Sequence, residues 1–395
     1  MKKGRRDRFG GWTGIKSDAA GFFRTECIDG RWWLIDPARN AFISIGLNHL
    51  SSDAMRSPEN LDVFTARYGD EKTWVKRGLV PDLKAWGFNT IGWTQENCVR
   101  YEPLDPLKRA RPHHPRRRWG KRTAVWYDRV WERERYGWAG MPYCHNLNFM
   151  MNAFYWDGTP WVSDYIPHYP DVFSQFFEDY CDWVARHFCS EMADDPNLIG
   201  YFYSDIPDWT GLVHTHAWVH EEDLEVEEGR ERLSAIARCY YEVTHAAVRR
   251  YDTNHLILGD RFLGNSGISD IVLDAMGETV DVLSIQYGGN FATERPHITR
   301  WHERTVLPIL MADVVMPPQY YNPPTQERRG AAYRRYLAAA LSHDAVVGIH
   351  FCGAYLENDV RQWGVKSARD EPYPGITDAF TEAHRDVYAI ATAKR

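Results

Sequence analysis

The segment NLIGYFYSDIPDW, residues 197–209, joins an apolar run to a polar loop. Residues 198–203 are apolar or aromatic apart from one glycine, which is typical of a strand buried on both faces of a parallel sheet. The run ends at Ser204-Asp205, and Trp209 follows shortly after. Other apolar runs of the chain also end in polar side chains, and this repetition decides the fold.

Seven clear strand-like runs and one weaker run alternate with helical patterns. The strand-like runs are 42–47, 88–93, 199–203, 255–259, 280–287, 306–312 and 346–352, with the weaker one at 143–149. Helical spacing of apolar residues occurs at 71–87, 171–192, 228–251 and 325–343. This alternation predicts an α/β chain that folds as a (β/α)₈ TIM barrel with inserted βα-loops. A doubly wound sheet is the alternative, but no Gly-rich phosphate loop follows any strand.

The chain divides into an N-terminal segment and the barrel. Asp29-Gly30 between apolar runs indicates a β-hairpin, so we expect residues 1–41 to form a small hairpin unit packed on the barrel of residues 42–395. Insertions are expected near 101–140 and 210–230.

Each insertion carries a run of charge. The basic, Pro-rich run 108–122 is typical of a solvated arm, although it could also grip an anionic substrate or a neighbouring subunit. The acidic run 220–232 indicates a solvated face. Neither run by itself predicts a function.

Composition narrows the class of protein. The 395 residues include 14% aromatics, with 17 Trp and 22 Tyr, which suits both a large core and a sugar-binding cleft. A net charge of −7 argues against a nucleic-acid partner. No uninterrupted apolar window approaches about 18 residues, so no membrane partner is expected. The basic start lacks an apolar segment behind it, and the seven cysteines form no CxxC pair, so we expect a cytoplasmic location.

Polar side chains follow the strands at the end where a TIM barrel carries its active site. Asp205 and Asp313 end the fourth and seventh strands, which face each other across the barrel mouth. Two carboxylates across a cleft are the working parts of glycoside hydrolysis, one as general acid and the other as nucleophile or base. A helix cap or a salt bridge is the structural alternative for each carboxylate.

Thirteen other side chains near strand ends are candidates for substrate binding, because rings stack on sugars and amides, acids and bases bind hydroxyls. They are Asn48, His49, Trp93, Gln95, Asn146, Trp209, Asp260, Arg261, Gln286, Tyr287, His350, Glu357 and Asn358. Tyr287 is also expected to touch the carboxylate of the seventh strand. Any single one is more often a capping or packing residue. No metal site and no cofactor is expected, since the close pairs His113-His114 and His214/His216 lack a carboxylate at ligand spacing.

Several stretches resemble the agarase-like branch of the (β/α)₈ glycoside hydrolases. These are DGRWWLIDPARNAFISIGLNHL, LKAWGFNTIGW, DDPNLIGYFYSDIPDW, LILGDRF, VDVLSIQY, LPILMAD and ENDVRQWGVK, in the family's order and over most of the chain. The resemblance implies hydrolysis of galactose-containing polysaccharides or oligosaccharides without a cofactor. It also implies that Asn48-His49 contact sugar, that Asp205 is the acid, and that Asp313 is the base or nucleophile.

The sequence departs from this family at the catalytic positions, where the family has Glu on both strands. Matching Ile206-Pro207 to the family's Leu-Pro places Asp205 on the acid, whereas a gapless match places Ile206 there. Asp208 or Glu357 could also replace a family Glu. An Asp side chain is shorter than a Glu side chain, so two Asp residues on the same backbone hold their carboxyl groups farther apart. We therefore expect a distance between the two carboxyls that admits a water molecule, and an inverting reaction.

The sequence therefore predicts a cytoplasmic glycosidase that acts on short galactose-containing or related oligosaccharides, in an exo manner. The alternative is a catalytically inactive barrel that binds sugars or serves as a scaffold, since both family Glu residues are replaced. A homo-oligomer is a further possibility through the basic arm. A lyase or epimerase fits less well because no Lys ends a strand.

Overall fold

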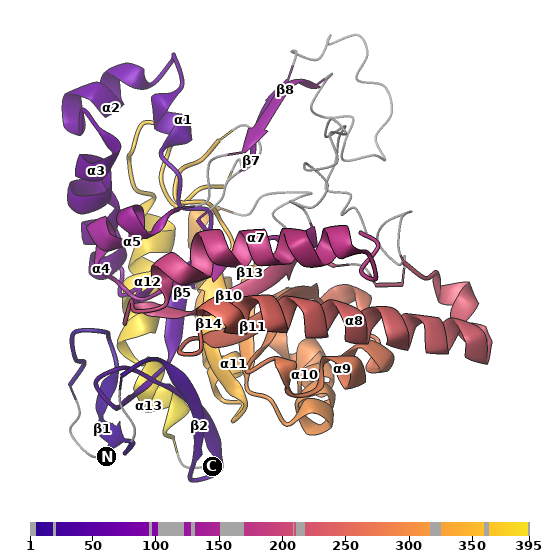
Figure 1. Ribbon diagram of the computed structural model, residues 1–395. Helices are drawn as coiled ribbons and strands as arrows, with labels where there is room; N and C mark the ends of the chain where they lie inside the picture. The colour runs from indigo at the N-terminus through magenta and orange to yellow at the C-terminus, as the bar shows by residue number, and fades with distance from the viewer. Residues whose placement is uncertain are drawn as a thin grey trace, which may run out of the picture.

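The structure is a computed structural model in which residues 5–18, 21–94, 97–101, 122–127, 131–150, 170–207, 209–210, 218–316, 325–358 and 363–393 are described. Eight parallel strands close into a barrel (Figure 1). In barrel order they are β5 (Ser44–Leu47), β6 (Thr90–Ile91), β9 (Tyr143–Asn146), β10 (Leu198–Asp205), β11 (Leu256–Leu263), β12 (Leu283–Gly288), β13 (Ile309–Val315) and β14 (Val346–Phe351). The predicted TIM barrel is confirmed, and its weak third strand is β9.

Helices pack around the outside of the barrel (Figure 1). They are α1 (Asp53–Arg56), α2 (Leu61–Arg67), α3 (Glu71–Trp74), α4 (Val80–Ala85), α5 (Arg133–Ala139), α7 (Gln175–Met192), α8 (Glu227–Tyr251), α9 (Asp270–Met276), α10 (Phe291–Thr305), α11 (Gln326–Leu341), α12 (Pro374–Arg385) and α13 (Val387–Ala391). The predicted helix at 171–192 begins later than expected. Ser174 caps α7 by accepting a hydrogen bond from the Phe177 N–H.

The predicted helix at 71–87 is divided into three parts. A π-helical turn, Val75–Leu79, separates α3 from α4. Pro81 lies in the first turn of α4, where its missing N–H leaves one ladder bond unmade. The π-helical turn lies shortly before Pro81, and buried residues continue through all three parts, from Trp74 to Leu83.

A four-stranded antiparallel sheet precedes the barrel. Its order is β1 (Trp12–Lys16), β4 (Asn40–Phe42), β3 (Arg31–Ile35) and β2 (Arg24–Ile28). The predicted hairpin is β2–β3, and its turn has φ of 53° at Asp29 and 79° at Gly30, as a two-residue hairpin loop requires. The sequence missed β1 and β4, which extend this hairpin into a sheet.

The antiparallel sheet covers the N-terminal end of the barrel. Trp32 N–H donates to the carbonyl of Asp344, two residues before β14, at 2.8 Å. An apolar cluster joins this sheet to the barrel interior; it contains Phe9, Phe23, Leu34 and Phe42 with Ile199, Phe202, Leu256, Leu258, Leu310 and Val347. Because this end of the barrel is filled, the carboxyl ends of the strands are left for a site.

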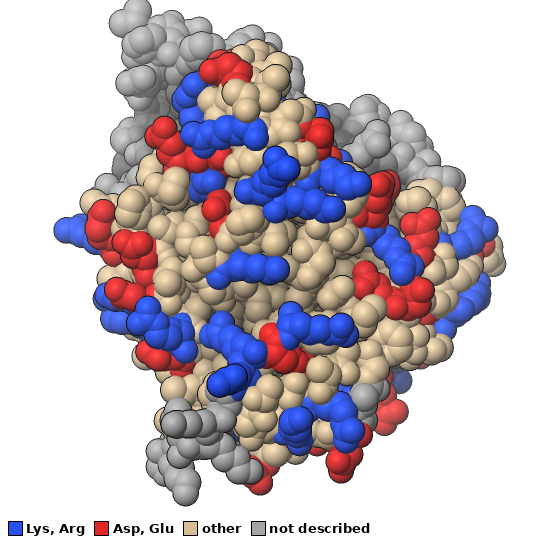
Figure 2. Space-filling view, turned by 90° about the vertical axis from the view of Figure 1, so that its left-hand side faces the viewer, with Lys and Arg blue, Asp and Glu red and all other residues tan. Residues whose placement is uncertain are grey.

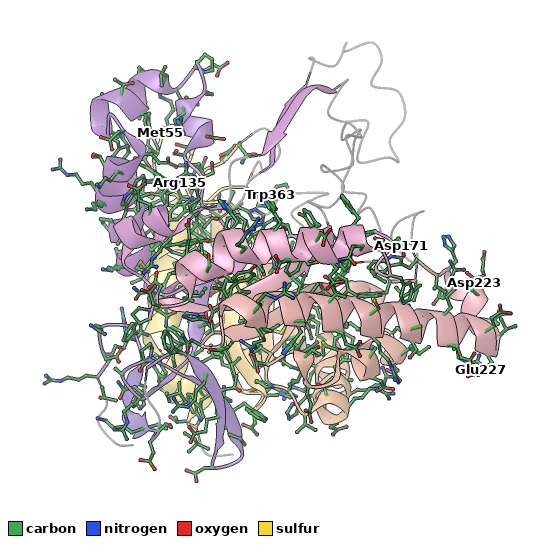
Figure 3. All side chains as sticks on the ribbon, in the orientation of Figure 1. Met55, Arg135, Asp171, Asp223, Glu227 and Trp363 are labelled. Carbon is green, nitrogen blue, oxygen red and sulfur yellow. The ribbon has the colours of Figure 1, made fainter. Side chains whose placement is uncertain are left out.

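Only parts of the two charged insertions belong to the residues that the structure describes. A hairpin of β7 (Asn97–Tyr101) and β8 (Arg122–Tyr127) is drawn at the end opposite the N-terminal sheet (Figure 1). Most of the basic run 108–122 lies outside the described residues. The acidic run is largely exposed, and Asp223 and Glu227 lie at the outer end of α8 (Figure 3), which confirms the predicted solvated face.

The described surface shows no large region of one charge sign on the face seen in Figure 2, where acidic and basic side chains alternate. Among the described residues, no helix is both long and apolar enough to cross a membrane.

Candidate active site

One buried guanidinium joins the two predicted carboxylates. Arg261, on β11, donates from Nη1 to Asp205 Oδ1 at 2.7 Å, and its Nη2 lies 3.5 Å from Asp313 Oδ2. Since the two Nη atoms of a guanidinium are about 2.3 Å apart, these carboxylate oxygens are separated by at most about 8.5 Å. The ends of β10 and β13 therefore meet in one site.

Asp205 is fixed by a second donor from the neighbouring strand. Gln286 Nε2 donates to Asp205 Oδ1 at 2.6 Å and to the Arg261 carbonyl at 3.0 Å. Ser204, one residue earlier, points outward and lies 2.9 Å from the Tyr240 hydroxyl of α8. Of this adjacent pair, Asp205 is thus the residue that faces the barrel.

The backbone turns sharply after Asp205. Ile206 has φ of 47°, which is unusual for a β-branched side chain and strained. Its N–H donates to the Arg261 carbonyl at 3.1 Å, so β11 holds this turn in place. Strain of this kind is typical of functional loops, where surrounding contacts enforce it.

Asp313 is oriented by an asparagine whose amide bonds on both sides. Asn48 Nδ2 donates to Asp313 Oδ1 at 2.6 Å and to the Ala312 carbonyl at 2.9 Å. Asn48 Oδ1 accepts from the Trp93 N–H at 2.8 Å. A Cβ at Gly92 would lie 2.1 Å from Asn48 Oδ1, so glycine is required there. Asn48 therefore holds the carboxylate in place while its own amide is fixed by two backbone groups, the Ala312 carbonyl and the Trp93 N–H.

Trp93 and His49 complete this side of the site. The Arg261 guanidinium carbon lies 4.5 Å from the centre of the Trp93 ring, a cation–π contact that covers one ring face. The Trp93 and His49 ring centres are 5.1 Å apart. Both side chains are buried, so they shape the wall of the site behind the carboxylates.

Cys352, which the sequence analysis did not select, also lies here. Its Sγ is 3.7 Å from His49 Nε2, and both side chains are buried. Potential ligand atoms of His49, Asp313 and Cys352 lie within 4.8 Å of one another. The sequence signal was present, since Cys352 directly follows β14, but a cysteine after an apolar run reads as core.

Two predicted binding residues, Trp209 and Tyr287, lie elsewhere than expected. Trp209 is enclosed by rings of Trp218, Tyr240 and Tyr241, with ring centres 4.5–5.9 Å away, and presents no open stacking face. Tyr287 packs on Trp301 of α10, outside the barrel, rather than on Asp313. These two positions correct the expected rim.

His350 and Asp260 have hydrogen-bond partners other than the two carboxylates. His350 Nε2 lies 2.8 Å from Ser44 Oγ inside the barrel, and burial lowers its pKa to about 3, so it is neutral there. Asp260 faces α8 and accepts hydrogen bonds from the hydroxyls of Tyr240 at 2.9 Å and Tyr241 at 2.7 Å.

The burial of the Asp260 carboxyl leads us to predict that the stability of the protein depends on pH. Burial raises the pKa of its carboxyl to about 7, against the lowering effect of the tyrosine hydroxyls. The folded protein therefore binds this proton more tightly than the unfolded chain does. Its contribution to stability is complete below about pH 4 and is lost as pH rises through about 7.

We expect Asp260→Asn to remove that dependence. Between about pH 5 and pH 8 the variant should gain about 2–3 kcal/mol relative to the parent chain, because it has no proton to lose. Urea unfolding at both pH values measures this, with the exposed Asp179→Asn as control. A variant whose stability difference stays constant across the range would contradict the prediction.

The remaining predicted residues are spread around the mouth. Asn146 is buried at the end of β9, where its Oδ1 accepts from the Asn148 N–H at 3.1 Å. Glu357 is half-buried and accepts a hydrogen bond from the Tyr373 hydroxyl, and Asn358 is half-buried beside it. Gln95, Asp208 and the paired histidines 113–114 and 214/216 lie outside the described residues. Trp363 lies above the barrel strands (Figure 3).

The site can thus supply two carboxylates under one cation, with amide donors from Asn48 and Gln286 that fix their orientation. Such a set can exchange protons with a bound substrate or attack it, and it can stabilise a cationic transition state.

Comparison with known proteins finds barrels of the same architecture. An agarase, AgWH50C, superposes with a TM-score of 0.71 at 18% identity, over 98% of this chain and 67% of that one. An exo-beta-agarase superposes with a TM-score of 0.69 at 16% identity, over 98% and 68%. At these identities the likeness shows the fold, and the chain spans about two thirds of the length of both structures.

A local sequence match is also found. A segment of 49 residues, 12% of the chain, is 45% identical to Beta-agarase B of Vibrio sp. (strain JT0107), and it covers 5% of that protein. No family model matches the chain.

Proposed function

We propose that this chain is a glycoside hydrolase whose carboxylate pair is Asp205 and Asp313. The main observation behind the proposal is that Arg261 contacts both carboxylates, which lie at the ends of strands four and seven. The barrel likeness to an agarase and the short match to Beta-agarase B support the reaction class.

In this proposal Asp205 is the general acid and Asp313 is the base or nucleophile. One guanidinium and two carboxylates carry one net negative charge, so a single proton on the pair leaves the trio neutral. General acid catalysis requires that proton on the residue facing the leaving oxygen. Arg261 lies beside both candidate positions of the proton, 2.7 Å from Asp205 Oδ1 and 3.5 Å from Asp313 Oδ2.

Glu357 is the other acid available near the mouth. The Tyr373 hydroxyl donates to its carboxylate, and the Glu357 N–H donates to the Lys366 carbonyl at 2.8 Å. These bonds tie Glu357 to the segment that follows it rather than to Arg261. We therefore keep the catalytic assignment on the two aspartates.

The proposed substrates are short galactose-containing or related oligosaccharides, cleaved from one end inside the cytoplasm. The structural similarity to an agarase and to an exo-beta-agarase supports this choice. Incubation with agar-derived oligosaccharides, galactosides and arabinosides should release small products from chain ends, which chromatography and mass spectrometry detect.

The proposed stereochemical outcome is inversion. Retaining sites separate their carboxyls by ~5–5.5 Å and inverting sites by ~6.5–9.5 Å. Each Asp reaches about 1.5 Å less than a Glu on the same backbone, which favours the wider class. Proton NMR of the first-formed product is expected to show the anomeric configuration opposite to that of the substrate. Net retention of the anomeric configuration would contradict this assignment.

A second function, sugar binding without hydrolysis, is favoured by one observation. Both carboxylates are engaged by a fully buried arginine, as in a structural ion-pair cluster. If no glycoside of the panel yields product while an oligosaccharide still binds, this second function replaces the first.

A further inference from the structure

A cluster of three different ligand types lies beside the carboxylate pair. His49 follows β5, Asp313 belongs to β13 and Cys352 follows β14, and all three side chains are buried. Their nitrogen, oxygen and sulfur atoms lie within 4.8 Å of one another. We propose that His49, Asp313 and Cys352 form a binding site for Zn²⁺ or a metal ion of similar preference.

The separation of the two softer ligands fits a tetrahedral zinc ion. Zinc bonds of about 2.3 Å to sulfur and about 2.0–2.1 Å to nitrogen, at a tetrahedral angle, place the two ligand atoms about 3.6 Å apart. The observed distance from Cys352 Sγ to His49 Nε2 is 3.7 Å. The site therefore needs little rearrangement to accept the ion.

The three residues are positioned by backbone contacts of His49 and Cys352 and by an amide contact of Asp313. Asn48 donates to Asp313 Oδ1 at 2.6 Å, which orients the carboxylate as a neighbouring amide does in known metal sites. His49 has φ of 58° and its N–H donates to the Trp93 carbonyl at 2.6 Å. The Cys352 N–H donates to the Val314 carbonyl at 3.0 Å. Such anchoring lowers the cost of assembling the site.

A divalent ion and a thiolate together can balance the charges of Arg261, Asp205 and Asp313, and Arg329 is a further buried cation that interacts electrostatically with Cys352. Arg261, Asp205 and Asp313 together carry one net negative charge when Cys352 is a thiol. Binding of Zn²⁺ releases the thiol proton to solvent, and the thiolate, the ion and the trio then sum to zero. The three protein ligands leave a fourth tetrahedral position for water or a substrate oxygen.

A thiol–imidazole hydrogen bond is the simpler account of the Cys352–His49 contact. It explains the 3.7 Å distance and leaves Asp313 to its contacts with Asn48 and Arg261. The two accounts differ in a measurable way, because only a metal site binds an ion through sulfur.

Binding of the ion does not depend on the proposed hydrolysis, but its effect on catalysis does. Coordination would occupy Asp313, the proposed base or nucleophile, so Zn²⁺ is expected to inhibit any glycosidase activity. If the ion binds and no glycoside is cleaved, the proposed function fails and the metal site stands.

Titration of the whole chain with Co²⁺, a spectroscopic substitute for zinc, tests the site. We expect one equivalent to bind with a thiolate-to-cobalt charge-transfer band in the near ultraviolet, and Zn²⁺ to displace it. Cys352→Ser should abolish the band, and His49→Asn, which suits a positive φ, should weaken binding at least about tenfold. The exposed Cys27→Ser variant should keep the parent spectrum.

Two results would overturn the site: no charge-transfer band in the parent chain, or a band that survives in Cys352→Ser. Circular dichroism of each variant checks its fold. If Cys352→Ser does not fold, Asn48→Ala decides, because loss of the amide that orients Asp313 should weaken Co²⁺ binding by about 10–100-fold. Unchanged affinity in that variant would count against the site.

Discussion

Asp313→Asn is expected to lower kcat on a cleaved glycoside by roughly 10³-fold or more. The amide has the size of the carboxylate and can still accept the Asn48 hydrogen bond through Oδ1. What it loses is the negative charge and the basicity that attack on the sugar, directly or through water, requires. Steady-state rates on the best substrate of the panel measure the loss.

A matched control is provided by Asp260→Asn. Asp260 also lies near the end of a barrel strand, but its side chain faces α8 and not Arg261. It should keep catalytic activity close to that of the parent chain. If Asp260→Asn and Asp313→Asn lose activity equally, the loss reflects damage to the fold rather than to the chemistry.

Asp205→Asn should separate the role of acid from that of base. An acid is needed most when the leaving group is a sugar and least when it is an acidic phenol. The defect of Asp205→Asn should therefore shrink on aryl glycosides with good leaving groups, whereas the defect of Asp313→Asn should not. Near-parental activity of both variants on oligosaccharides would move the chemistry to Glu357 or Asp208.

Arg261→Met is expected to cost about 3–5 kcal/mol of the free energy of unfolding near neutral pH. The guanidinium is fully buried, and its removal leaves Asp205 and Asp313 without their cation. A buried charge that loses its partner is more costly than the intact pair is favourable. Chemical denaturation followed by tryptophan fluorescence measures the difference.

Two further variants make this second experiment specific. Adding Asp205→Asn to Arg261→Met removes one orphaned charge and should recover part of the lost stability. Arg329→Met removes another buried guanidinium, one whose Nε and Nη2 have no hydrogen-bond partner, so its cost should be much smaller. Equal losses in Arg261→Met and Arg329→Met would show that packing, and not charge pairing, explains both.

The predictability of the site varied with the kind of residue. Asp205 and Asp313 could be selected because each is a carboxylate directly after an apolar run, and the barrel brings strands four and seven together. Cys352 could not, because its sequence context is that of a core residue. Its neighbours His49 and Asp313 are far away in the chain and meet it only in the closed barrel.

Side-chain direction was the main source of error. Asp260 and Arg261 are consecutive, and the sequence placed both on the rim, but one faces α8 and the other faces the two carboxylates. Gln286 and Tyr287 divide in the same way, one toward Asp205 and the other toward Trp301.

The sequence by itself determined the order of strands and helices, the closed barrel and the end at which the carboxylates gather, because these depend on local apolar periodicity and on strand order. The tertiary structure decided which strand-end residues face inward. The strand pairing shifts register between Phe202 and Asp205, between Ile285 and Gln286, and between Met311 and Val314. Each irregularity breaks the two-residue alternation, so facing cannot be counted along the chain.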